Sequence, residues 1–290
     1  MAEVDIWERI RARDLEWLIE TTGETGTDPS DLRRDARRLV ELSEHPAAAA
    51  ALLRDSVEPF PAVAPALVFL VLVSHTLRAL RSRRFVAEPV SGTGDLPVFD
   101  ADELRSFAAD PSRRLFLADL LASFVHLESG VRWVLSQTGW RRQRYSDLDP
   151  VSVAQRLADA TGAERHAALR RLGDVSLFLS GIFPEHARDH PLEARRLERI
   201  RRLLAAASAR PVEGPGEIVL ATGGVRGVWL LEWLGRQAYE LAAETARPDD
   251  ARLIGDVARR FRVARRTLNA VASLGLGGLR GRWFPVGGPA

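Results

Sequence analysis

Aspartate–proline pairs recur along this chain, and they constrain its fold more than any other feature. Asp28-Pro29, Asp110-Pro111 and Asp149-Pro150 each stand directly before a segment in which apolar residues have helical spacing. An aspartate at the N-cap accepts hydrogen bonds from the first backbone N–H groups of a helix. Proline fits the first helical position because it has no N–H group to leave unbonded. The pairs predict three helix starts and favour an all-α chain.

The longest apolar run is PAVAPALVFLVLV, residues 61–73. It is shorter than the ~20 residues that a membrane-spanning helix needs, and it leads directly into Ser74, His75 and Arg78. We interpret it as a buried central helix from about Pro65 to Arg84. The first twenty residues alternate charged and apolar side chains and lack the apolar core of a signal peptide, so the sequence predicts a cytoplasmic protein.

One segment departs from helical spacing. In VRWVLSQTGWRRQRY, residues 131–145, Val131, Trp133 and Leu135 alternate with polar residues, and Thr138-Gly139 is suited to a turn. We predict one small β-hairpin near 131–145 within an otherwise all-α, multi-helix bundle.

Glycine and proline indicate how the chain is divided. RPVEGPGE, residues 210–217, is typical of a linker. We expect a helical domain at 1–210 that carries the hairpin, and a C-terminal helical pair at 218–275 packed on it as one compact unit. The pair comprises helices from Arg226 to Thr245 and from Asp250 to about Leu274. We expect a Gly-rich tail at 276–290 that is flexible except where Trp283 and Phe284 dock. Gly173-Asp174 predicts a break between two helices, with Asp174 as the N-cap of the second.

Arginine supplies every basic charge of the chain. No lysine is present, and 41 basic residues face 39 acidic ones for a net charge of +2. Because RRLERIRR (195–202) carries an acid at helical spacing, we interpret it as a solvated helix face. WRRQRY (140–145) and RRFRVARR (259–266) contain no acid, which is typical of a phosphate-binding surface. The candidate nucleic-acid contacts are Arg141, Arg142, Arg144, Arg260, Arg262 and Arg266.

Two histidines are the candidates for a metal site. His186 and His190 are four residues apart, a spacing that places two ligands on one helical face. Pro184 and Pro191 restrict the segment to a short helix, and Arg188 between the histidines disfavours a dication. The chain contains no cysteine, which excludes thiolate ligands and disulfides. The sequence therefore predicts neither a metal nor a cofactor.

Motifs of known enzyme classes are missing. EIVLATGGVRG, residues 217–227, places a glycine turn before a helix, but no βαβ series or Gly-Lys-Ser/Thr accompanies it. We interpret it as a flexible entry to that helix. No Gly-x-Ser-x-Gly elbow and no paired Glu-x-x-His set occurs either. An enzyme would need an enclosed pocket holding His126, Glu128 or His186 with a second titratable group.

Four stretches, in chain order, carry a resemblance to other proteins: PVFDADEL (97–104), RRQRYSDLD (141–149), RRLGDVSLFLSGIFPEHA (170–187) and LEWLGRQAYELAAE (231–244). They resemble an uncharacterised prokaryotic family of all-helical proteins, over about the middle two-thirds of the chain. The resemblance implies a shared helical packing unit. It implies no activity and no functional residue.

The sequence by itself favours a non-catalytic role. We expect a helical binding or adaptor protein, monomeric or homodimeric, that recognises a protein partner or a small apolar ligand between its helices. The alternatives are a nucleic-acid-binding protein that uses the arginine patches at 141–144 and 259–266, and an enzyme with a His/carboxylate site. The residues expected to line the groove are Phe124, His126, Glu128, Phe178, Ile182, Phe183, Trp229, Trp233 and Tyr239.

Overall fold

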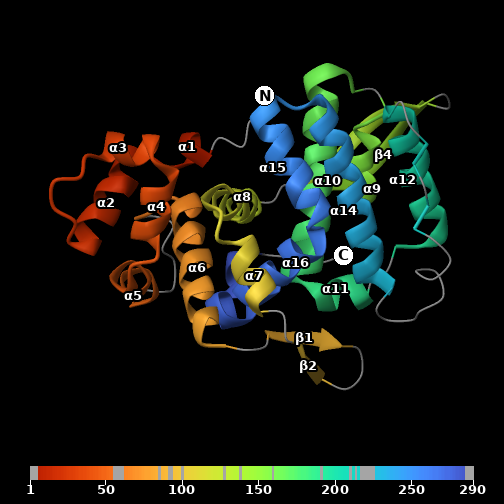
Figure 1. Ribbon diagram of the computed structural model, residues 1–290. Helices are drawn as coiled ribbons and strands as arrows, with labels where there is room; N and C mark the ends of the chain where they lie inside the picture. The colour runs from red at the N-terminus through yellow and green to blue at the C-terminus, as the bar shows by residue number, and fades with distance from the viewer. Residues whose placement is uncertain are drawn as a thin grey trace. The chain divides into compact units, whose positions relative to one another are not determined.

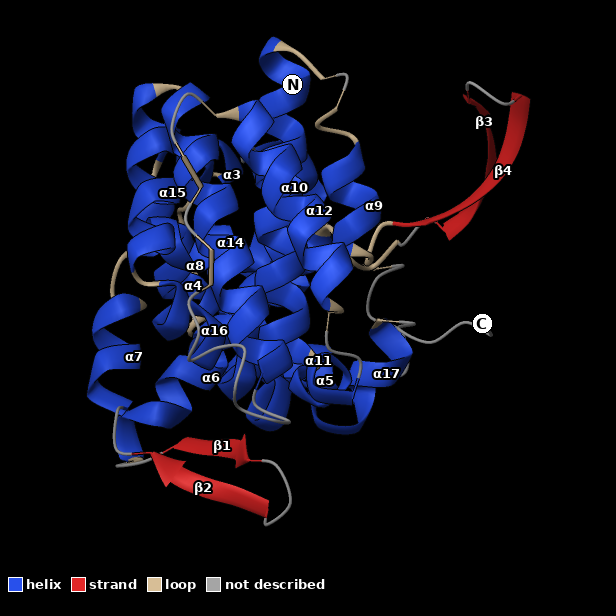
Figure 2. Ribbon diagram, turned by 90° about the vertical axis from the view of Figure 1, so that its right-hand side faces the viewer, coloured by secondary structure: helices blue, strands red, loops and turns tan. Residues whose placement is uncertain are grey.

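The computed structural model describes most of the chain, and helices make up most of what it describes (Figure 2). The described residues are 6–54, 62–83, 86–90, 94–98, 101–126, 129–136, 139–158, 160–189, 192–208, 211–212, 214–215 and 226–284, with the strands described by their backbone. The predicted all-α class is confirmed.

Two compact units divide the chain. One is formed by residues 126–261, and the other combines the N-terminal part up to Val125 with the C-terminal part from Arg262 onward. The sequence places a boundary at 210–218 instead. The structure differs because the helix that follows this segment packs most extensively on a helix that precedes it, within the same unit.

The unit at 126–261 is built around two long helices, α10 and α14, which lie side by side (Figures 1 and 2). Its helices are α9 (Pro150–Gln155), α10 (Gly162–Ile182), α11 (Pro184–Asp189), α12 (Ala194–Ala207), α14 (Arg226–Thr245) and α15 (Pro248–Arg259). Most of the residues that fill its interior are apolar and almost fully buried, as Phe178 and Leu234 illustrate.

The second unit is built around α6, the apolar helix predicted from residues 61–73. Its helical elements are α1 (Ile6–Arg9), α2 (Ala12–Thr22), α3 (Pro29–Arg34), α4 (Ala36–Ser43), α5 (Pro46–Arg54), α6 (Pro65–Ala79), η1 (Leu80–Ser82), α7 (Ala101–Phe107), α8 (Pro111–Ala122), α16 (Phe261–Ala270, whose first residue belongs to the other unit), η2 (Val271–Leu276), η3 (Gly277–Leu279) and α17 (Arg280–Trp283). Every residue from Ala66 to Ser74 is buried.

Among the described residues, one helical stretch, Pro65–Ser82, is long and apolar enough to cross a membrane by length and composition. The same stretch is 67% buried inside the structure, and the core helix of a folded domain also meets both criteria.

Two aromatic residues of the predicted Gly-rich tail at 276–290 pack on α6. Residues up to Phe284 are described, and Trp283 and Phe284 are both buried. The ring of Phe284 stacks on Phe69 of α6 at a centroid distance of 5.4 Å, and Trp283 meets the same ring edge-on at 5.9 Å. These two aromatic side chains hold the segment on α6, at the two positions where the sequence predicts that the otherwise flexible tail docks.

The three aspartate–proline pairs mark helix starts as predicted. Asp28, Asp110 and Asp149 are the N-caps of α3, α8 and α9, and each carboxylate accepts a hydrogen bond from a backbone N–H of its helix. The predicted helix at 250–274 is interrupted. Two helices, α15 and α16, meet at Arg260, and a π-helical turn, η2, follows.

Two antiparallel strand pairs accompany the helices among the described residues. β1 (Val86–Val90) pairs with β2 (Gly94–Val98), and β3 (Ser129–Ser136) pairs with β4 (Gly139–Ser146). The sequence predicts a single hairpin and interprets 88–97 as a loop, so the prediction of one hairpin is not confirmed as it stands.

Candidate functional site

A cluster of three ionisable side chains lies in the interior of the unit at 126–261. One carboxylate oxygen of Asp174, Oδ1, accepts hydrogen bonds from Arg170 Nε at 2.8 Å and from the Tyr239 hydroxyl at 2.7 Å. The Arg170 guanidinium also lies over the Tyr239 ring, 5.7 Å from its centre. Burial, followed by the charge of Asp174, raises the pKa of Tyr239 well above its usual value. The cluster therefore keeps a neutral tyrosine that donates to a carboxylate.

Asp174 is not the N-cap that the sequence predicts. It lies inside α10, which continues unbroken from Gly162 to Ile182. The preceding glycine has a packing role, because a Cβ at Gly173 would lie 2.4 Å from the Tyr239 ring. Gly173 thus lets α14 approach closely enough for the Tyr239 hydroxyl to reach Asp174.

His166 lies one turn before this cluster on α10. Its Nδ1 is 3.0 Å from the carbonyl oxygen of Ala242 and 3.1 Å from the Thr245 hydroxyl. Partial burial lowers the pKa of His166 below its ordinary value of 6.5. The folded chain therefore favours the neutral imidazole, whose Nδ1–H donates to the Ala242 carbonyl.

We expect His166 to make the protein less stable in mild acid. In the unfolded chain His166 regains its ordinary pKa, so the unfolded chain binds more protons than the folded one. The contribution of His166 to the free energy of unfolding is therefore complete above about pH 6.5, and it is lost as the pH falls toward the lowered pKa of His166 in the folded chain. His166→Asn should flatten the dependence of the unfolding free energy on pH between about 5 and 7, measured by urea denaturation. The exposed His126→Asn is the control and should leave the slope unchanged. An unchanged slope in His166→Asn would contradict the assignment.

Most residues of the predicted groove lie in the interior. Phe178, Ile182 and Tyr239 expose none of their surface, Phe183 and Trp233 are also buried, and Phe124 is buried in the other unit. Trp229 is 38% exposed and His126 is exposed, whereas Glu128 lies outside the described residues. The buried members pack against their own chain, so their side chains offer a partner no surface.

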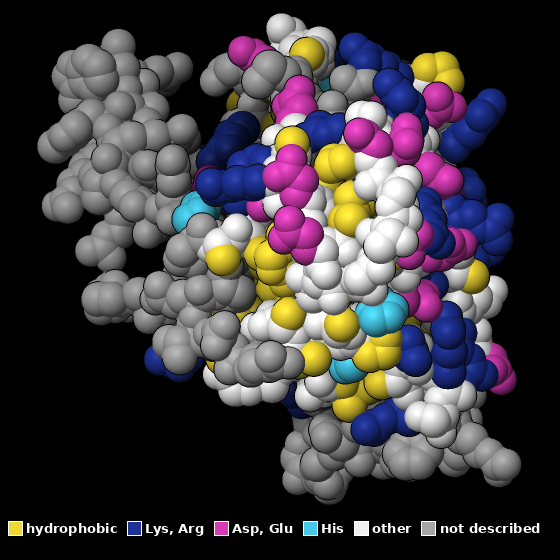
Figure 3. Space-filling model, turned by 90° about the vertical axis from the view of Figure 1, so that its left-hand side faces the viewer, with side chains coloured by type: hydrophobic (Ala, Val, Ile, Leu, Met, Phe, Trp, Pro, Cys, Tyr) yellow, Lys and Arg dark blue, Asp and Glu magenta, His cyan; other side chains and the backbone are white. Residues whose placement is uncertain are grey.

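The predicted nucleic-acid contacts are only partly described. The side chains of Arg141, Arg142 and Arg144 lie outside the described residues, while Arg262 is exposed and Arg266 is half-buried, four residues apart on α16. The segment RRFRVARR is not uncompensated as the sequence suggests. Asp256, one turn earlier, pairs with Arg259 at 3.5 Å and with Arg260 at 3.7 Å. Acidic and basic side chains are likewise interspersed on the face shown in Figure 3.

The histidine pair remains a hypothesis. His186 is half-buried on α11, and His190 lies outside the described residues. Among the described residues, no group of three or more histidine or acidic side chains has an arrangement that fits a metal ion.

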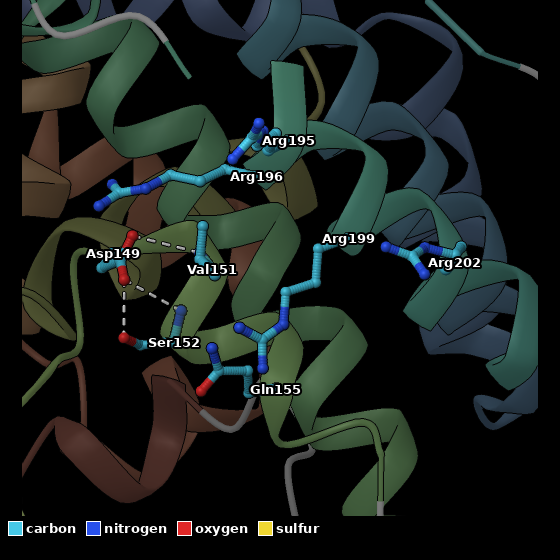
Figure 4. A pocket seen from close by; sticks show the side chains of 8 residues that line it. All are labelled: Asp149, Val151, Ser152, Gln155, Arg195, Arg196, Arg199 and Arg202. Atoms are coloured by element: carbon cyan, nitrogen blue, oxygen red, sulfur yellow. Dashed lines mark hydrogen bonds between the residues drawn. The ribbon is translucent and has the colours of Figure 1, made fainter. Parts of the chain in front are cut away.

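A pocket of about 400 Å³ opens between α9 and α12, which contact each other in the unit at 126–261 (Figure 4). α12 buries Leu197, Ile200 and Leu204, which share one helical face. The opposite face is rich in arginine. The residues that line the pocket are Asp149, Val151, Ser152 and Gln155 from the α9 side and Arg195, Arg196, Arg199 and Arg202 from α12.

The α9 side of the pocket is held in place by the N-cap. The Asp149 carboxylate accepts from the backbone N–H groups of Val151 at 3.3 Å and Ser152 at 3.1 Å, and from the Ser152 hydroxyl at 2.7 Å. In Figure 4 the Arg199 side chain extends from α12 toward Gln155. The cap therefore fixes Asp149 and Ser152 at the wall that faces the arginines.

Some arginines of α12 have their positive charge compensated by a carboxylate, and others do not. Glu198 binds Arg201 through two hydrogen bonds of 2.8 and 2.9 Å and lies 3.8 Å from Arg202. Its bonds to Arg201 lower the pKa of Glu198 below the ordinary value. Among the described residues, Arg195, Arg196 and Arg199 have no hydrogen bond or ion pair. Three of the guanidinium groups that line the pocket thus have no carboxylate paired with them.

Sequence reasoning missed this site because it treated Glu198 as compensation for the whole cluster. The segment 195–202 contains five arginines and one glutamate, and the two oxygens of one carboxylate cannot pair with all five guanidinium groups. That imbalance was the available signal. It does not reveal the pocket, because Asp149 and Ser152 precede α12 by more than forty residues.

Fold and pocket together define an all-α protein with an arginine-lined pocket. No protein-family model matches this chain, and neither does any curated protein or solved structure. The chemistry of the pocket residues therefore carries the functional proposal.

Proposed function

We propose that this protein binds a small anionic ligand, with a phosphate as the group recognised, in the pocket between α9 and α12. The observation that carries the proposal is the set of three guanidinium groups, from Arg195, Arg196 and Arg199, that line the pocket without a carboxylate partner. A guanidinium presents N–H donors in a planar fork that matches the oxygens of a phosphate.

Electrostatics supports an anion over the apolar ligand expected from the sequence. Four arginines and one aspartate line the pocket, and the Asp149 carboxylate already accepts three hydrogen bonds from α9. The excess of positive charge attracts an anion, and each charge-assisted hydrogen bond to it contributes about 1.5–3 kcal/mol. The volume of about 400 Å³ lies within the range of small-molecule sites.

Arg199→Ala should weaken the binding of inorganic phosphate and pyrophosphate about tenfold, because it removes one charge-assisted donor pair. The measurement is isothermal titration calorimetry at low ionic strength, where surface electrostatics is least screened. Neutralising Arg195, Arg196 and Arg199 together should abolish detectable binding.

Arg252→Ala is the matched control, since it removes the same charge from a side chain that is 82% exposed on α15 and does not line the pocket. Its affinity should equal that of the unmodified protein. Equal affinities in Arg199→Ala and Arg252→Ala would refute the pocket as the binding site. An oligonucleotide that binds far more tightly than pyrophosphate, with a steep loss on adding salt, would favour the nucleic-acid alternative.

A further inference from the structure

The two walls of the pocket differ in hydrogen-bonding character. The α12 wall consists of arginines, which can donate but cannot accept. On the α9 wall, the Ser152 hydroxyl donates its one proton to Asp149 Oδ2 at 2.7 Å, so that its oxygen faces other groups only as an acceptor. The α12 wall therefore only donates, whereas on the facing wall Asp149 and Ser152 present acceptors beside the Gln155 amide, which can donate as well as accept.

The second carboxylate oxygen of Asp149 keeps unused accepting capacity. Among the described residues, Asp149 Oδ1 receives one hydrogen bond, from the Val151 N–H at the long distance of 3.3 Å, whereas Oδ2 receives two shorter ones. A carboxylate oxygen has two lone pairs, so Oδ1 can accept a further donor. A fully deprotonated anion offers none, and would leave this wall unmatched.

Ligand groups that can donate to this wall are either cationic, such as an ammonium, or neutral, such as a hydroxyl. An ammonium would have to enter a pocket in which four arginines outnumber one aspartate. The net positive charge of the lining therefore disfavours an ammonium. A neutral hydroxyl has no such penalty, so the charge balance favours it.

We infer, on the basis of the proposed function, that the ligand is a phosphate monoester of a polyol, such as a sugar phosphate, with its phosphate on the arginines of α12 and its hydroxyls donating to Asp149 Oδ1 and Ser152 Oγ. The size of the pocket agrees. At ~30 Å³ per water it holds about a dozen water molecules, so that inorganic phosphate alone leaves most of it filled with solvent.

The test compares four probes by calorimetry: inorganic phosphate, glucose 6-phosphate, n-hexyl phosphate and phosphoethanolamine. Glucose 6-phosphate should bind about tenfold or more tightly than n-hexyl phosphate, which has a six-carbon chain but no hydroxyls. Phosphoethanolamine should bind no more tightly than inorganic phosphate. Equal binding of the sugar and alkyl phosphates would overturn the inference, as would a preference for phosphoethanolamine.

Asp149→Asn is the informative variant, because asparagine caps a helix as well as aspartate does and keeps α9 intact. It should lower the preference for glucose 6-phosphate over n-hexyl phosphate about fivefold or more, while the affinity for inorganic phosphate is unchanged or rises. Ser152→Ala should reduce the same preference. If both variants leave it unchanged, the inference is wrong although phosphate binding stands. If no phosphate compound binds in an Arg199-dependent way, the proposed function itself fails.

Discussion

Asp174→Ala should lower the free energy of unfolding by about 3–5 kcal/mol, the usual cost of removing one partner from a buried ion pair. The substitution takes the shared acceptor from both Arg170 and Tyr239, which are 5% and 0% exposed. The Arg170 guanidinium then stays buried beside α14 without its carboxylate. Chemical denaturation followed by tryptophan fluorescence measures the change.

Two further variants separate the charge from the loss of packing. Tyr239→Phe removes only the hydroxyl and should cost about 1–2 kcal/mol. Arg170→Met combined with Asp174→Ala should be less destabilising than Asp174→Ala alone, because it also removes the buried guanidinium that has lost this carboxylate. The solvent-exposed Glu198→Ala is the control and should change stability far less than Asp174→Ala does. A double variant less stable than the single one would show that the charge is not the cause.

Gly227→Ala should destabilise the protein by about 3 kcal/mol or more, at or beyond the upper end of the usual cost of overpacking. A Cβ at this position would lie 1.7 Å from the carbonyl oxygen of Ala187, which belongs to α11. A clash with backbone is not relieved by turning a side chain, so α11 and α14 must move apart. The measurement is the midpoint and slope of urea denaturation.

Gly255→Ala is the matched control in a neighbouring helix. The Cβ at Gly255 would meet no atom closer than 3.5 Å. A helix interior is more stable with alanine than with glycine by about 0.5–1 kcal/mol. This variant should therefore be slightly more stable than the unmodified protein. If Gly227→Ala is as stable as Gly255→Ala, the close approach of α14 to α11 is refuted.

Local chemistry made the helices predictable. Asp28, Asp110 and Asp149 cap their own helices, so the interaction that starts each helix lies within three residues of sequence. The predicted helix Arg226–Thr245 has the bounds of α14 for the same kind of reason, since its apolar residues follow helical spacing. Such signals do not depend on what the rest of the chain does.

Predictions failed where a distant residue decides. Gly173-Asp174 has the local pattern of a helix break. In the fold, however, Asp174 accepts hydrogen bonds from Tyr239 and Arg170, and the Tyr239 ring leaves no room for a Cβ at Gly173. Apolar residues at helical spacing form the same pattern in a groove and in a core. Six of the nine predicted groove residues are buried, and those six are part of the core.

From the sequence alone came the all-α class, the helix starts and the balance of charge, because each depends on neighbours along the chain. Tertiary structure decided which arginines have a carboxylate and which do not. It placed Asp149 and Ser152 opposite α12, so that they line one pocket together with Arg195, Arg196 and Arg199. Counter-charges act through space over a few ångströms, so a pattern read along one helix does not determine them.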